Sequence, residues 1–226
     1  LTDEAGARAM EAAGVDNGRM DVIGADATIR DVYHLDRPVE DFEATLAALC
    51  ATSMRVSPHI VVGLHYGRVL GEARALDIVS RHAVEALVLV VVMPFYAKPG
   101  LYAVPDAAEV GHIFGEARQR LPDRHVLLGC ARPPGLHKRV VDAYAVMAGL
   151  DGIAFPADGV VGVARAIGRP FHQEHACCSI KLGGERAAHV RDNRRIATQR
   201  RFRRVVIQVN PPRRVGPPPW LAHLEP

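Results

Sequence analysis

The sequence predicts an α/β fold, a partial (β/α) TIM-like barrel of about five parallel βα units. Short β-branched runs alternate with stretches of helical spacing along the first three quarters of the chain. Two of the runs are apolar nearly throughout, as in strands covered on both faces. No Gly-x-Gly-x-x-Gly follows any run, which disfavours a dinucleotide-binding sheet. Strand–helix–strand units at this spacing make parallel neighbours with right-handed crossovers, so a barrel is expected.

The predicted elements follow one another in a regular order. An acidic amphipathic helix over residues 2–14 opens the chain, and Pro38 with Glu40 and Asp41 begins a second helix, because proline and carboxylates suit a first turn. The five predicted strands cover residues 20–24, 56–64, 86–93, 125–130 and 152–155. Further helices are predicted over residues 71–82, 105–120, 136–148 and 158–167.

Composition excludes several classes of protein. With 226 residues, 49% hydrophobic residues and a net charge of only +3, the chain can bury a core and is not disordered throughout. Its longest apolar run, residues 86–95, is shorter than the roughly 18 to 20 residues of a membrane-spanning helix. The first residues lack the pattern of a signal peptide, and four cysteines do not make a disulfide framework at this length. We therefore expect a cytoplasmic protein.

Charge divides the chain into two parts. Residues 180–226 hold eleven Lys/Arg and three Asp/Glu, whereas residues 1–179 carry a net charge of −5. We expect residues 1–179 to form the barrel and residues 180–226 to form a mostly disordered Arg/Pro-rich tail. The tail is interpreted as a solvated appendage in preference to a polybasic arm for RNA or an acidic partner. A third interpretation is that the tail is the product of a shifted reading frame.

The predicted strands end in glycines and prolines. Gly63 and Gly67 surround His65, Pro94 follows Met93, and Gly-Cys-Ala-Arg-Pro covers residues 129–133. Glycine lets a ligand approach the backbone, and proline turns the chain without a donor. Because barrel chemistry gathers where strands run into their loops, these ends predict a rim suited to a planar cofactor.

These segments, together with Glu-Ala-Ala-Gly-Val-Asp at residues 11–16 and Cys-Cys-Ser at 177–179, resemble the radical S-adenosylmethionine superfamily. Within it, the likeness is to biotin synthase-related proteins, including archaeal-type lipoyl synthase subunits. It covers residues 2–179, and its most specific piece is residues 58–67. The resemblance implies a [4Fe-4S] cluster, held by a Cys-x3-Cys-x2-Cys loop after the first strand, that cleaves S-adenosylmethionine.

This chain has no such cysteine loop. By the resemblance, its five strands correspond to the last five of eight, so that the chain is the C-terminal portion of a truncated enzyme, inactive alone in radical generation. Its substrate would be a small molecule or a lipoyl- or biotin-type group, and its reaction sulfur insertion, methylthiolation or a carbon-skeleton step. We expect an exposed barrel edge to cause self-association or to bind a partner subunit.

The resemblance also implies roles for particular residues. Asp21 would contact the ribose or, alternatively, cap the following turn. Gly63 would approach the adenine, as would Met93 and Pro94 at a strand end. His65 would donate a hydrogen bond to cofactor or substrate, or be a satisfied rim histidine.

Two further predictions concern the next strand end and the cysteines. Arg132 could bind a carboxylate through its fork or form a structural salt bridge. Cys130, Cys177 and Cys178 could hold an auxiliary iron–sulfur centre, whereas the alternative for Cys130 is a small buried hydrophobe.

Two other functions remain open. A different barrel lyase or hydrolase would use Asp21, His65 and Arg132, although no His-x-His or paired carboxylates mark a metal site at the strand ends. A non-catalytic binding protein would use the basic arm, with nucleic acid the less favoured partner. The sequence offers no membrane partner.

Overall fold

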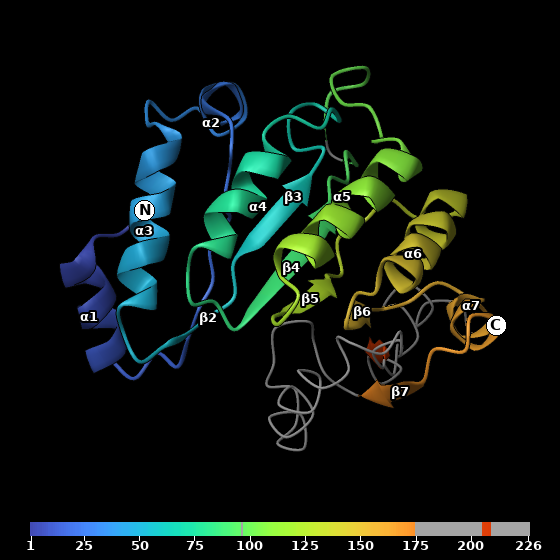
Figure 1. The fold of residues 1–226 in the computed structure, drawn as a ribbon. Helices are drawn as coiled ribbons and strands as arrows, with labels where there is room; N and C mark the ends of the chain where they lie inside the picture. The colour runs from blue at the N-terminus through green and yellow to red at the C-terminus, as the bar shows by residue number, and fades with distance from the viewer. Residues whose placement is uncertain (96, 175–204, 209–226) are drawn as a thin grey trace, which may run out of the picture.

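An all-parallel six-stranded sheet forms the centre of the structure, a computed structural model that describes residues 1–95, 97–174 and 205–208 (Figure 1). Its strand order is β3-β4-β5-β6-β8-β7. The strands are β3 (His59–Val62), β4 (Ala86–Val91), β5 (His125–Leu128), β6 (Gly152–Ala154), β7 (Phe171–Glu174) and β8 (Val205–Gln208). A separate parallel pair joins β1 (Asn17–Gly18) to β2 (Arg55–Val56). The predicted α/β class with parallel neighbours is confirmed.

Seven helices accompany these strands in the described residues. They are α1 (Glu4–Ala12), α2 (Asp26–Val32), α3 (Val39–Cys50), α4 (Glu72–Ser80), α5 (Ala107–Arg120), α6 (Leu136–Ala148) and α7 (Val160–Ala166). Helices α4, α5 and α6 lie side by side on one face of the sheet (Figure 1). None of the helices in the described part of the chain has both the length and the apolar character needed to cross a membrane.

The first predicted strand, residues 20–24, is reduced to a single bridge at the edge of the sheet. Asp21 pairs with His59 of β3 in parallel register. The amide of Val22 donates to the carbonyl of His59, and the amide of His59 donates to the carbonyl of Met20, both at 2.8 Å. Beyond this bridge the segment separates from β3 and leads into α2.

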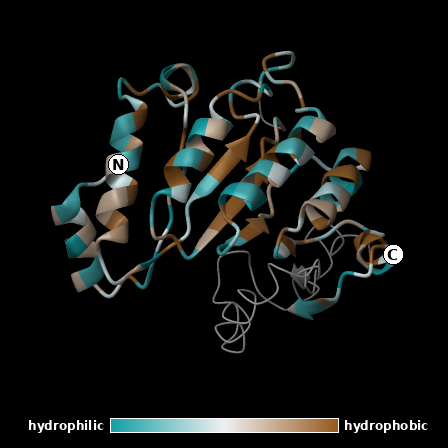
Figure 2. Ribbon diagram, viewed as in Figure 1, coloured by the Kyte–Doolittle hydropathy of each residue, from teal (hydrophilic) through white to brown (hydrophobic). Residues whose placement is uncertain are grey.

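The sheet has a different core on each face. Leu87, Leu89 and Val91 of β4 belong to the main core beneath the helices. On the opposite face a second cluster contains Ala86, Val88, Leu127 and Ala154. Figure 2 shows β4 as hydrophobic along its length. This explains the continuous apolar run in the sequence, because both faces of the strand are buried.

The basic tail contributes one described element. β8 lies within the segment predicted to be mostly disordered, and it pairs with both β6 and β7. Its four residues fall in the apolar run Val205–Val209, which the charge pattern led us to discount. Residues 180–204 and 209–226, where the remaining predictions for the tail fall, lie outside the described residues.

Helix α5 begins with a side-chain cap that provides a test of the local structure. Asp106 Oδ1 accepts hydrogen bonds from the amides of Ala108 and Glu109 at 2.8 and 3.1 Å. Asp106→Ala is expected to lower the free energy of unfolding by about 1 kcal/mol, because it leaves these amides without an acceptor. Urea unfolding measures the change, with Asp123→Ala at an exposed turn as the control. Equal losses in the two variants would contradict a capping role.

Candidate active site

Strand pairing places one polar pair on the sheet face that the helices do not cover. Asp21 pairs with His59, His59 is in register with Val88, and Val88 is in register with Leu127. Paired neighbours in a sheet point to the same face. Val88 and Leu127 belong to the core cluster opposite the helices, so Asp21 and His59 lie on that same face. In a (β/α) barrel this is the inner face.

Asp21 is held by a tyrosine from the segment after α2. Tyr33 Oη donates to Asp21 Oδ2 at 2.5 Å, and the Tyr33 ring meets Phe42 edge-on with ring centres 6.4 Å apart. Burial raises the pKa of Tyr33 well above its ordinary value, and the hydrogen bond to Asp21 raises it further. Tyr33 therefore remains a protonated donor at physiological pH, and Asp21 is its acceptor.

His59 is the second titratable group of this face. Burial is the main influence on its pKa and lowers it below the ordinary value, while the negative charge of Asp21 opposes the shift. The imidazole is consequently neutral at pH 7. Asp21 and His59 thus present two proton acceptors side by side, both half-buried.

Two of the predicted site residues, Gly63 and His65, form a tight turn after β3. Gly63 has a φ of 77°, and its amide donates to Glu72 Oε1 at 2.8 Å. His65 is buried, with Nδ1 3.3 Å from Thr28 Oγ1 and its ring 5.1 Å from the ring of Tyr66. This arrangement is that of a satisfied rim histidine, one of the two alternatives raised by the sequence.

Met93 and Pro94 follow the end of β4. Met93 is 38% exposed, Pro94 is half-buried, and the neighbouring Phe95 is 61% exposed. Exposed apolar side chains at a strand end are available to contact a ligand. They lie one strand away from β3 and therefore beside the Gly63 turn.

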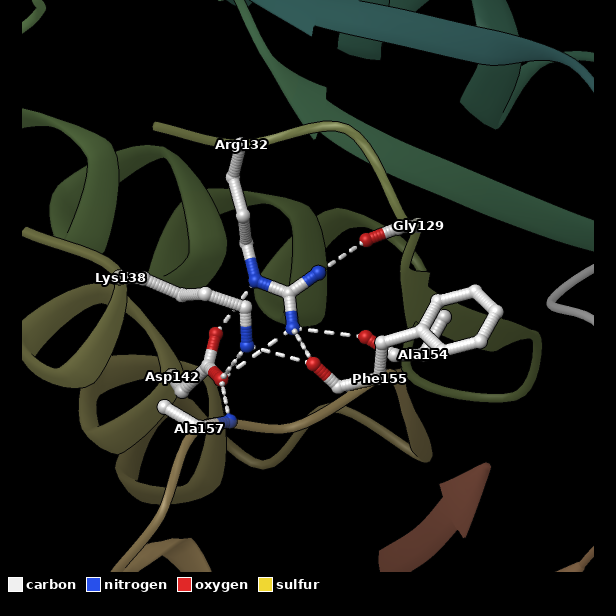
Figure 3. Close-up of polar contacts among 7 residues, drawn as sticks. All are labelled: Gly129, Arg132, Lys138, Asp142, Ala154, Phe155 and Ala157. Carbon is white, nitrogen blue, oxygen red and sulfur yellow. Dashed lines mark hydrogen bonds and ion pairs between the residues drawn. The ribbon is translucent and has the colours of Figure 1, made fainter. Parts of the chain in front are cut away.

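Arg132 lies in a buried network rather than at an open site (Figure 3). Its side chain and that of Asp142 are both fully buried, with Nε–Oδ1 at 2.5 Å and Nη2–Oδ2 at 3.2 Å. The guanidinium also donates to the carbonyls of Gly129, Ala154 and Phe155 at 2.5, 2.7 and 3.1 Å. Arg132 thus connects the ends of β5 and β6 to α6, the structural salt bridge that was the alternative to ligand binding.

Lys138 completes this network from the first turn of α6. Its Nζ donates to Asp142 Oδ2 at 3.1 Å and to the carbonyl of Phe155 at 2.5 Å. Phe155 has a φ of 47°, which is unusual for a residue with a side chain. Burial is the main cause that lowers the pKa of Lys138. The side chains of Arg132 and Lys138 both donate hydrogen bonds to the carbonyl of Phe155 and thereby hold its backbone in this conformation.

Of the three cysteines predicted to hold an auxiliary iron–sulfur centre, the structure describes Cys130. Cys130 is exposed after β5 rather than a buried hydrophobe, and Cys50 lies at the end of α3. Cys177 and Cys178 lie outside the described residues. No group of three or more His, Cys, Asp or Glu side chains within the described ranges is arranged to hold a metal ion. A [4Fe-4S] cluster of the radical type requires three thiolates, and the described residues contain two cysteines, Cys50 and Cys130.

Several residues that contact the predicted site residues could not be recognised from the sequence. Tyr33, Glu72 and Asp142 were not among the predicted site residues. One signal was available for Asp142: it occupies an apolar position of α6 between Val141 and Ala145, where an unpaired charge would be costly. No comparable pattern marked Tyr33.

Comparisons with known proteins found similar solved structures and no matching family. No protein-family model matches the chain, and no curated protein matches it. Two solved structures are similar to it, both crystal structures of 2,3-dimethylmalate lyase, a PEP mutase/isocitrate lyase superfamily member. The trigonal form has a TM-score of 0.45 and 17% identity over 92% of this chain and 70% of that chain. The triclinic form has a TM-score of 0.44 and 18% identity over 92% and 73%.

These findings correct the expected family. The assignment to the radical S-adenosylmethionine superfamily, with its biotin synthase-like and lipoyl synthase-like relatives, is wrong: the similar structures are lyases of another superfamily. S-adenosylmethionine and the iron–sulfur cluster were expected from that resemblance alone, so neither cofactor is supported any longer. The motifs that suggested the family have structural roles, since Gly63 makes a turn and Arg132 joins two strand ends. Parallel βα units of many families contain tight turns after a strand and polar side chains that join neighbouring strand ends, so these motifs do not identify one family.

Proposed function

We propose that this chain is a barrel enzyme of the lyase class, which acts on a small molecule by general acid–base chemistry with Asp21 as proton acceptor. The observation that carries the proposal is the Asp21–Tyr33 hydrogen bond of 2.5 Å beside neutral His59, on the face without helices. Active sites of (β/α) barrels lie where strands run into their loops. Asp21 is three residues from the end of its segment at Gly24.

The chemistry follows from the protonated hydroxyl of Tyr33 and the neutral imidazole of His59 on either side of Asp21. Tyr33 is protonated and engages Asp21 Oδ2, and Oδ1 is the atom assigned to the substrate proton. Asp21 takes a proton from a substrate hydroxyl or acidic carbon, and the electron pair left behind forms a double bond. The bond to the leaving fragment breaks, and that fragment departs with the electrons of the bond and takes up a proton from water. Neutral His59 orients the substrate or receives the proton from Asp21.

The neighbouring rim supplies contacts for the rest of the substrate. Met93 and Phe95 are exposed at the end of β4, and Pro94 between them turns the chain. Apolar side chains at this position favour a substrate that carries alkyl groups beside its reacting hydroxyl or carbonyl. Among the predicted site residues, Asp21, Met93 and Pro94 therefore take part in the proposal, whereas Gly63 and His65 shape the turn beside them.

The test measures conversion of a panel of 2-hydroxy and 2-oxo carboxylic acids in deuterated buffer by NMR, with and without a divalent cation. The panel includes 2,3-dimethylmalate, the compound named for the two similar structures. We expect cleavage or carbon-bound deuterium exchange of at least one compound. Asp21→Asn is expected to reduce its rate about 100-fold or more, because amide nitrogen and oxygen cannot accept the proton.

Asp123→Asn is the matched control, since it makes the same chemical change at an exposed turn before β5. It is expected to leave the rate unchanged. Absence of any conversion across the panel, or an equal rate in Asp21→Asn and the wild type, would show that Asp21 is not the proton acceptor.

A further inference from the structure

Phe155, the first residue after β6, breaks the alternation of side chains along that strand. In β6, Ile153 belongs to the main core beneath the helices, and Ala154 belongs to the cluster on the inner face. Successive side chains of a strand point to opposite faces, so the side chain at position 155 would be expected beneath the helices. Instead, the Phe155 ring packs against the same inner cluster as Ala154. Two consecutive side chains therefore face the side of the sheet that the helices do not cover.

A strained backbone directs the Phe155 ring to this face. Its φ of 47° lies in the left-handed region, which costs free energy for a residue with a side chain. The hydrogen bonds from Arg132 and Lys138 to its carbonyl hold the residue there. Figure 3 shows the ring on the side of Phe155 away from Asp142 and Lys138. Residues that their surroundings hold in strained conformations cluster at active sites and ligand-binding sites.

Strand pairing connects this ring to the Asp21–His59 pair. Val61 is two residues beyond His59 on β3, so it lies on the same face, roughly 7 Å further along the strand. Val61 is in register with Val90 of β4, and Val90 packs against the same inner cluster as Phe155. Val61, Val90 and Phe155 are all half-buried, so each keeps part of its surface for a ligand. We call these three residues the apolar strip.

We propose that the apolar strip binds an alkyl chain of the substrate, and that Phe155 contacts the far end of this chain. The proposal deepens the proposed function and rests on it for the reacting group beside Asp21. It names the substrate class as 2-hydroxy or 2-oxo carboxylic acids with an unbranched chain. Because one strand separates β4 from β6, Val90 and Phe155 lie roughly 10 Å apart across the sheet, a distance that a chain of several carbons covers.

The chemistry of the strip favours a chain without polar groups. Between Val90 and Phe155 the inner face carries Gly129 and Ala154, which add no polar side chain. Each methylene group that leaves water at such a surface adds favourable binding free energy, whereas a polar group would lose its hydration without gaining a partner. Affinity is therefore expected to increase with the length of an alkyl chain.

Isothermal titration calorimetry of the whole chain with 2-hydroxybutyrate and 2-hydroxyoctanoate tests the strip without any turnover. We expect the wild type to bind the octanoate about tenfold more tightly or better, because only its chain reaches the strip. Phe155→Ala is expected to weaken octanoate binding about tenfold and to leave butyrate binding unchanged. A wild type without preference for the octanoate, or an equal change for both acids in Phe155→Ala, would overturn the proposal.

Phe171→Ala is the matched control, since Phe171 of β7 is also half-buried but packs against the main core beneath the helices. It is expected to leave both affinities unchanged, and an equal loss of octanoate binding in this variant would refute a specific role of Phe155. Phe155→Leu keeps an apolar side chain and is expected to retain most of the preference. A wild type that prefers the octanoate but converts no acid of the panel would refute the proposed function and leave the strip in place.

Glycine and alanine at position 155 test the strained backbone that directs the ring. In an extended strand glycine is less stable than alanine, because it loses more backbone entropy on folding. At a φ of 47° the order reverses, since glycine adopts this conformation at little cost. Phe155→Gly is therefore expected to have a higher urea midpoint than Phe155→Ala, whereas Phe171→Gly is expected to have a lower one than Phe171→Ala. The same order at both positions would contradict the placement of the ring on which the proposal depends.

Discussion

Arg132→Ala is expected to lower the free energy of unfolding by about 3 kcal/mol, near the lower end of the loss for a broken buried ion pair. The change removes both hydrogen bonds to Asp142 and the donors to three carbonyls at the ends of β5 and β6. Asp142 would remain fully buried and, among the described residues, would keep Lys138 and the amide of Ala157 as partners. Lys138 still compensates part of the negative charge of Asp142, so the expected loss of stability lies near the lower end of the range for a broken buried ion pair.

Urea unfolding measures this loss, and Arg120→Ala provides the matched control. Arg120 also has two carboxylate partners, Asp77 and Glu116, but its side chain is 30% exposed. Solvent screens such a pair, so the control is expected to lose about 1 kcal/mol or less. Equal losses in the two variants would show that burial of the Arg132 network does not contribute to stability.

A double variant separates the ion pair from the backbone bonds. Arg132→Met with Asp142→Leu removes both charges and leaves apolar side chains in their place. It is expected to recover part of the stability lost in Arg132→Ala, because no fully buried carboxylate is left behind, while Lys138 keeps its hydrogen bond to the carbonyl of Phe155. Recovery is incomplete, because the carbonyls of Gly129, Ala154 and Phe155 still lack their donors.

The main elements of the barrel could be predicted from the sequence because parallel strands and their helices have strong local patterns. The helix predicted over residues 136–148 matches α6, and the run at residues 86–93 contains β4. Helix α2 was not predicted: it has seven residues and no side-chain N-cap. β7 and β8 were missed because only a few apolar residues mark each strand, and the charge of the tail obscured β8.

The site was harder to predict because it depends on contacts between distant segments. Asp21 and His65 were selected as residues at strand ends, yet the sequence does not reveal that Tyr33 turns back onto Asp21. The segment Gly-Cys-Ala-Arg-Pro indicates an arginine beyond a strand end, but the partner of Arg132 lies in the next helix. Its identity depends on the path of the loop, which no local pattern specifies. The same loop turns the guanidinium into the protein.

Gly24→Ala is expected to lower the free energy of unfolding by about 3 kcal/mol, because the end of the 20–24 segment is in backbone contact with the start of α4. A Cβ at Gly24 would collide with the carbonyl oxygen of Gly71 and lie 2.6 Å from the amide nitrogen of Ala75. Backbone atoms cannot turn away as a side chain can, so α4 must move as a unit.

The size of this effect can be measured against the same substitution at an open position. Gly115 lies inside α5, and a Cβ there would have nothing within 4 Å. Gly115→Ala is expected to raise the free energy of unfolding by about 0.5–1 kcal/mol, since alanine loses less backbone entropy in a helix. Urea unfolding of both variants therefore should give changes of opposite sign. A loss at Gly24 no larger than a few tenths of a kcal/mol would mean that α4 can shift freely away from the 20–24 segment.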